Sequence, residues 1–141
     1  MTLKVGRVDL WTASIDDRAG GAADKVEPLS KAGANFEFVF SHRTPEQPGR
    51  GIVFVTPVKG TKVVQAAQSA GFTKPENLHS VRIEGTNKPG ITAKVARALA
   101  NAGISFRALS ATGIGSKFVS YVALDTAEDA VKAVSLLRRL S

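Results

Sequence analysis

A weak internal repeat is the sequence feature that most constrains the fold of this chain. When the 141 residues are shifted on themselves by 70 positions, residues 17–36 align with residues 87–106. Six of the twenty aligned positions are identical, whereas composition alone predicts about one or two. The identical pairs are Gly20/Gly90, Ala23/Ala93, Leu29/Leu99, Ala32/Ala102, Gly33/Gly103 and Phe36/Phe106. These residue types shape a backbone or fill a core, so the repeat predicts two similar supersecondary units.

The second copy of the repeat has the clearer pattern. Val81 and Ile83 alternate with polar residues, which predicts a half-buried strand. An Asn-Lys-Pro-Gly turn over 87–90 precedes apolar residues at helical spacing, and Gly103 is placed to end that helix. The remaining expected elements are a strand over 104–108, a hairpin turn over 112–116, a strand over 117–124 and a capped helix from 125 onward.

The first copy follows the same order. We expect one long first strand between residues 2 and 15, a turn over 16–20, a helix to Lys31, a strand with Phe36, Phe38 and Phe40 on one side, a strand over 52–56 and a helix over 61–70. Pro28 falls inside the first helix, where a proline costs about 3 kcal/mol, so a kink or a late helix start is expected there.

Each copy therefore has the order strand, helix, strand, strand, helix, which is a split βαβ pattern. The predicted class is α+β, with helices packed on antiparallel sheets. We divide the chain into a first repeat over residues 1–74 and a second over 75–141. A unit of this size buries little surface alone, so we expect the two repeats to fold together.

Composition limits the environment and the chemistry. The chain is 43% hydrophobic and 22% charged, as a packed domain requires. Its net charge of +7 comes from scattered residues, which favours a solvated basic surface over a nucleic-acid patch. It has no cysteine, no apolar run of membrane-spanning length and no visible secretory signal. These features predict a cytoplasmic protein.

The sequence NKPGITAKVARALANAGI, residues 87–104, resembles the first strand-to-helix segment of the ACT domain, a ferredoxin-like βαββαβ regulatory module. The sequence DRAGGAADKVEPLSKAGANF, residues 17–36, is similar to it as a second instance. The resemblance covers nearly the whole chain as two tandem copies. Neither copy has an obvious fourth strand, because the sequence stops after the last helix and residues 74–76 read as a loop. The long first strand is a candidate to supply a missing edge.

The resemblance implies a ligand site, since ACT domains typically bind small molecules, usually amino acids, at the loop between the first strand and the first helix. Backbone N–H groups at a helix start attract a carboxylate, and an asparagine can both donate and accept. The first loop departs from the family, with Ala19 in place of proline and Gly21 in place of a bulky apolar residue. The plainer interpretation is that Asn87 and Asp17 only cap turns. The candidate ligand-binding residues are Asn87, Lys88, Pro89, Gly90, Ile91 and Thr92 in the second loop and Asp16, Asp17, Gly20 and Gly21 in the first.

No catalytic, metal or cofactor motif accompanies this loop. The two histidines, His42 and His79, lack the partners of a catalytic or metal site. RGIVFVTP, residues 50–57, partly matches an RNA-recognition signature but has Ile52 and Pro57 where aromatic residues are expected, and Trp11 is the only aromatic of the candidate first strands. We therefore do not expect nucleic acid as a partner.

The sequence predicts a non-catalytic regulatory or sensor protein that binds an amino acid and forms a homodimer through the unpaired strand edge of its second repeat. Two alternatives stay open: a scaffold or interaction module for a partner enzyme, and an RNA-binding βαββαβ module.

Overall fold

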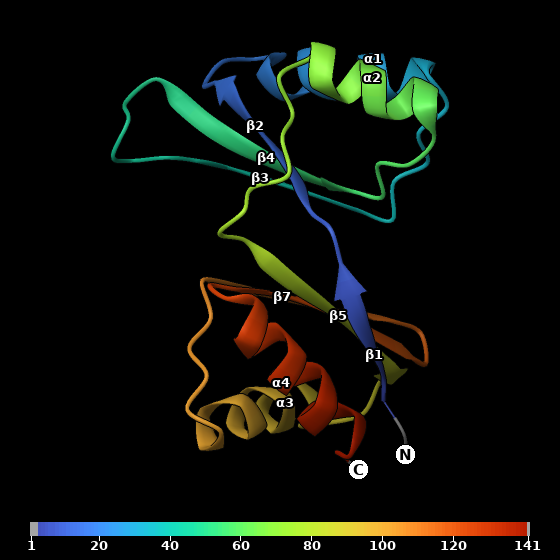
Figure 1. Cartoon of the computed structure of the whole chain (residues 1–141), viewed down its shortest axis with the longest axis vertical. Helices are drawn as coiled ribbons and strands as arrows, with labels where there is room; N and C mark the ends of the chain where they lie inside the picture. The colour runs from blue at the N-terminus through green and yellow to red at the C-terminus, as the bar shows by residue number, and fades with distance from the viewer. Residues whose placement is uncertain (1–2, 141) are drawn as a thin grey trace. The chain divides into compact units, whose positions relative to one another are not determined.

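The computed structural model describes residues 3–140, which form two compact units (Figure 1). One unit comprises residues 9–75, and the other joins the N-terminal segment through Val8 to the residues from Glu76 onward. The elements in chain order are β1 (Lys4–Val8), β2 (Trp11–Asp16), α1 (Gly21–Lys31), β3 (Phe38–Arg43), β4 (Arg50–Thr56), α2 (Thr61–Ser69), β5 (His79–Thr86), α3 (Ile91–Asn101), β6 (Ala108–Ile114), β7 (Lys117–Leu124) and α4 (Ala127–Arg138).

The unit of residues 9–75 has an antiparallel three-stranded sheet in the order β2-β4-β3. Helices α1 and α2 cover one face of it (Figure 1). Alternate residues of the strands point to opposite faces, so Val53 and Val55 lie in the core while Phe54 lies on the other face. The buried core residues are Ala13, Ile15, Leu29, Val53, Val55, Ala67 and Phe72.

The other unit has a four-stranded antiparallel sheet in the order β1-β5-β7-β6, with α3 and α4 on one face (Figure 1). Val81 and Ile83 of β5 are fully buried, as their alternation in the sequence predicts. They pack against α3 and α4 through residues that include Val95, Leu99, Ala133 and Leu137.

Both units repeat the order strand, helix, strand, strand, helix, which confirms the predicted α+β, ferredoxin-like class. The single strand expected between residues 2 and 15 is wrong. It is two strands, β1 and β2, and each belongs to a different sheet. Residues 3–8, assigned from the sequence to the first repeat, therefore group with the second unit.

Strand β1 stands beside β5 as the fourth strand of its sheet, with Lys4 opposite Glu84 and Val8 opposite Ser80. The unit of residues 9–75 has no such strand in the described chain. There, only an isolated bridge joins Thr12 to Thr73, through N–H···O bonds of 2.8 and 2.9 Å. The sequence did not show where a fourth strand of each repeat would come from. In the structure one unit receives β1 as its fourth strand, and the described part of the other unit has three strands.

Glycines end three of the helices. Gly33, Gly71 and Gly103 follow α1, α2 and α3 with positive φ, and the following residue donates its N–H to a carbonyl in the last helical turn. The cap predicted at Gly103 is confirmed. The late start expected from Pro28 is wrong, because α1 begins at Gly21 and runs through the proline to Lys31.

No helix of the described chain is long and apolar enough to cross a membrane.

Candidate functional site

The loop from β5 to α3 begins its helix with a glycine in place of a capping side chain. Gly90 has φ 86° and makes no side-chain cap, and Ile91 donates its N–H to Lys88 O at 3.2 Å. Within the described residues, the N–H groups of Thr92 and Ala93 have no acceptor. Two donors at the positive end of a helix are thus directed at solvent, an arrangement that suits a carboxylate.

Asn87 is held against the hairpin between β6 and β7. Its backbone N–H donates to Ser116 O at 2.8 Å, and Nδ2 approaches Gly115 O at 3.4 Å. A Cβ at Gly113 would lie 2.6 Å from Nδ2, so a side chain there would displace the asparagine from this position. The exposed side chain leaves Oδ1 without a partner among the described residues, and this oxygen can accept a bond from an ammonium group.

The rest of this loop is exposed except for one buried residue, Ile91. Lys88, Pro89 and Thr92 are exposed, whereas Ile91 is buried in the core beneath α3. The first turn of α3 carries no acidic side chain. Nothing on the helix itself therefore neutralises the positive end of its dipole.

The loop from β2 to α1 repeats this backbone with a tighter junction. Gly20 has φ 87° and no side-chain cap, and the N–H groups of Ala22 and Ala23 lack acceptors within the described residues. At Gly21 a Cβ would lie 2.1 Å from the carbonyl oxygen of Asp16. The helix thus begins directly against the end of its strand, where only glycine fits.

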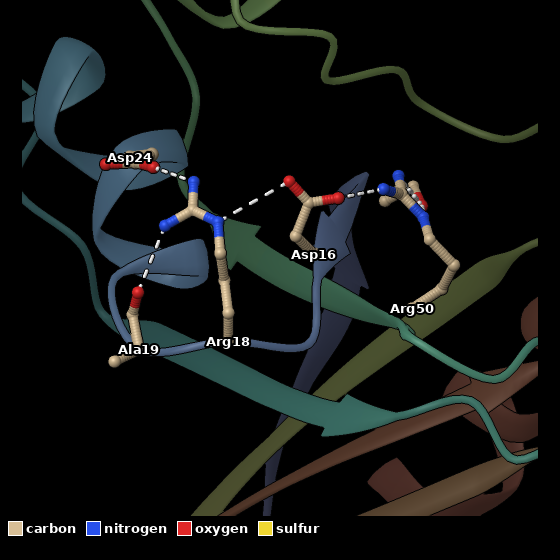
Figure 2. Close-up of polar contacts among 6 residues, drawn as sticks. Asp16, Arg18, Ala19, Asp24 and Arg50 are labelled. Atoms are coloured by element: carbon tan, nitrogen blue, oxygen red, sulfur yellow. Dashed lines mark hydrogen bonds and ion pairs between the residues drawn. The ribbon is translucent and has the colours of Figure 1, made fainter.

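A chain of ion pairs crosses this first loop (Figure 2). Asp16, at the end of β2, pairs with Arg50 of β4 and also lies 3.6 Å from Nε of Arg18. Arg18 Nη2 lies 2.6 Å from Oδ2 of Asp24 in α1, and the hydrogen bond to Asp24 raises the pKa of Arg18. Asp17 pairs with Arg43 at 2.8 Å. Both acidic residues among the candidate ligand-binding residues of this loop are therefore already bound to arginines.

A hollow of about 320 Å³ lies beside this chain of ion pairs. It is lined by side chains of both signs, among them Asp16, Arg18 and Arg50. Lys25 also lines it and donates to Ala70 O at 2.8 Å, where the lysine neutralises the carboxyl end of α2. The hollow can hold a small zwitterion only if the ligand competes with the internal ion pairs.

The predicted site residues thus form two separate loops, one in each unit. Sequence reasoning missed Arg18, Arg43 and Arg50, which bind the acids of the first loop, and Gly113, which seats Asn87. Strand pairing would have identified such partners, since Asp16 lies opposite Arg50 in the register of β2 and β4. A single sequence does not display that register.

Aromatic rings gather on the sheet face opposite α1 and α2. The centroid of Phe40 lies 6.4 Å from those of Phe38 and Phe54 and 5.6 Å from that of His42. An RNA-binding module needs aromatic rings on the open face of its sheet, and this cluster supplies rings that the candidate first strands did not offer in the sequence. Arg50 of β4 pairs with Asp16, and Arg43, on the other side of β3, pairs with Asp17, so neither guanidinium group is free to bind a phosphate.

No group of three or more histidine, aspartate or glutamate side chains within residues 3–140 could hold a metal ion. His42 donates from Nδ1 to Arg43 O at 2.7 Å, and Arg7 donates to Nδ1 of His79 at 3.1 Å.

The strand order and the one-sided helices define each unit as a ferredoxin-like α+β module. Within the second unit, residues 79–141 match the family model of the ACT domain.

Three solved structures share the fold. A protein from Bacteroides thetaiotaomicron has a TM-score of 0.73 at 16% identity, over 93% of this chain and 88% of its own. The ligand-free regulatory subunit of aspartate kinase from Thermus thermophilus has a TM-score of 0.67 at 18% identity, over 99% and 97%. The corresponding subunit from Thermus flavus has a TM-score of 0.58 at 20% identity, over 96% and 95%. No curated protein sequence matches the chain.

Proposed function

We propose that this chain is a non-catalytic, cytoplasmic regulatory protein that binds an amino acid at the loop Asn87–Thr92 and acts on a partner enzyme. The observation that carries the proposal is the pair of unpartnered N–H groups behind Gly90, in the part of the chain that matches the ACT domain. Two structures of similar fold are regulatory subunits of aspartate kinase, which supports a regulatory role.

The ligand carboxylate would bind the N–H groups of Thr92 and Ala93. Its ammonium group would face Oδ1 of Asn87, which the hairpin holds in place. Gly90 has no heavy atom within 4 Å of an added Cβ, so the ligand can approach the backbone closely. The first loop, with Asp16, Asp17, Gly20 and Gly21, is the second candidate because its acids are already paired.

A thermal-shift screen of the common amino acids tests the proposal. A ligand at about one hundred times its Kd stabilises the folded chain by about 2.7 kcal/mol. Asn87→Ala should remove a hydrogen bond of about 0.5–1.5 kcal/mol from the binding free energy. Gly90→Val should abolish the shift.

The matched control is Gly103→Val at the other end of α3. Gly103 also has positive φ and open space at its Cβ, so the substitution imposes similar backbone strain away from the loop. Retention of the ligand shift in Gly90→Val and Asn87→Ala would move the site to the Asp16–Gly21 loop. If no amino acid shifts the melting temperature, the interaction-module alternative replaces ligand binding.

A further inference from the structure

A shallow hollow of about 370 Å³ lies beside α4 and β1, outside both ligand loops. Its apolar floor is made by Val131 and Val134 of α4. Val131 is 61% exposed, although the same helix buries Ala130, Ala133 and Leu137 in the core. Val131 therefore presents apolar surface that the fold itself does not use.

Three arginines surround this floor: Arg7 from β1, Arg138 from the last turn of α4, and Arg139 directly after that helix. Arg138 donates from Nε to Val5 O at 3.0 Å, and Arg7 donates to His79. Both guanidinium groups are thus positioned by neutral acceptors. Within residues 3–140 none of the three arginines forms an ion pair, and no acidic side chain lines the hollow.

Helix electrostatics explain only part of this arrangement. Arg138 and Arg139 lie at the carboxyl end of α4, where cations are favoured by the helix dipole. That preference explains neither Arg7, which comes from a strand, nor the exposed valine between the charges. Cations around an apolar floor complement a segment that carries carboxylates beside an aliphatic side chain.

We propose that the hollow between β1 and α4 docks an acidic, aliphatic segment of a partner protein. The partner's aliphatic side chain rests on Val131 and Val134, and its carboxylates pair with Arg7 and Arg139. A single-stranded nucleic acid fits less well, because no aromatic ring lines the hollow to stack a base. The inference goes beyond ligand binding, since it assigns the surface through which this unit meets another protein.

The probe is a short labelled peptide in which leucines are flanked by glutamates, titrated with the full chain and followed by fluorescence anisotropy. We expect binding that weakens as salt is raised. Arg139→Glu and Val131→Asp should each weaken it roughly tenfold or more, which corresponds to about 1.4 kcal/mol. Both residues are exposed, so circular dichroism melts should match wild type.

The charge-matched control is Arg97→Glu, an exposed α3 arginine without an ion pair in the described structure. It should bind the peptide as wild type does. Equal weakening by Arg97→Glu and Arg139→Glu would show attraction to overall charge and overturn the proposal. Three other results would overturn it. The chain does not bind the peptide, or it binds a peptide with glutamine in place of glutamate equally well. It binds oligo(U) more tightly than the peptide, and this binding depends on Arg139.

Discussion

Gly21 and Ile91 occupy equivalent positions at the starts of α1 and α3, and they meet the preceding strand differently. Ile91 buries its side chain in the core beneath its helix. At Gly21, the carbonyl oxygen of Asp16 instead occupies the space that a side chain would need. From the sequence, Gly21 read as a departure from the ACT pattern. The structure gives the physical reason, a helix that starts closer to its strand.

Gly21→Ala should therefore destabilise the unit of residues 9–75. The added Cβ would lie 2.1 Å from a backbone oxygen, so the strand and helix must separate. Overpacking of this kind costs about 1–3 kcal/mol. Urea denaturation would measure the loss in the free energy of unfolding. Gly6→Ala is the control, because a Cβ there meets no atom within 4 Å, and an equal loss in both variants would contradict the steric explanation.

Glu84 should make stability depend on pH in the acid range. A hydrogen bond from Arg82 at 2.8 Å, with Lys117 at 3.5 Å, lowers the pKa of Glu84 below its usual value of 4.5. A lowered folded-state pKa stabilises the fold above the unfolded pKa, and this contribution disappears as pH falls through the folded value. Glu84→Gln should cost up to about 1 kcal/mol at neutral pH.

Melting temperatures measured from neutral pH downward test this prediction. The gap between wild type and Glu84→Gln should narrow as pH falls below about 4.5. The control is Glu76→Gln, which removes an exposed carboxylate that has no ion pair in the described structure. A gap that stays constant through the acid range would mean that the ionised carboxylate is not what stabilises the fold.

At the scale of single residues, the sequence predicted what local turn chemistry determines. Gly90, Gly20 and Gly103 stand where helices begin and end, and their left-handed backbone could be inferred from the neighbouring residues. The partners of Asp16 and Asn87 could not be inferred. They lie on other strands, and only the sheet register brings them together.

At the scale of the element, β1 shows where periodicity stops being informative. Leu3, Val5, Ala13 and Ile15 are all buried and all odd-numbered, so one alternating strand fits them all. They nevertheless belong to two different cores. One local sign of a break is the buried even-numbered Leu10. The order of the other elements could be predicted because each has its own turn or cap signal.

Removal of residues 1–8 should destabilise the unit that contains α3 and α4. The deletion exposes the edge of β5 and removes Leu3 and Val5 from the core. Amide hydrogen exchange would locate the effect: the β5 amides should lose protection, while those of β4 in the other unit keep theirs.

Leu3→Ala isolates the packing part of this effect, since truncating a buried leucine costs about 2–5 kcal/mol. The result that would sink the assignment of β1 is unchanged β5 protection in the deleted chain.

At the scale of the whole molecule, the structure changes which strand edge is expected to form a homodimer. The sequence placed the unpaired edge in the second repeat, but β1 fills that position. In the described chain, β3 is an outer strand of the three-stranded sheet, and it exposes 48% of Val39 and 47% of Phe40. An apolar edge strand favours pairing with another chain. We therefore expect a homodimer through β3.

Light scattering across a wide concentration range tests the dimer. Val39→Lys should shift the chain towards monomer, because a lysine on an edge strand opposes strand addition. Ile114→Lys is the matched control, since Ile114 is 67% exposed at the end of the other sheet's outer strand, β6. It should leave the dimer intact. A wild-type chain that stays monomeric at every concentration would rule out the dimer, and a dimer lost only in Ile114→Lys would move the interface to β6.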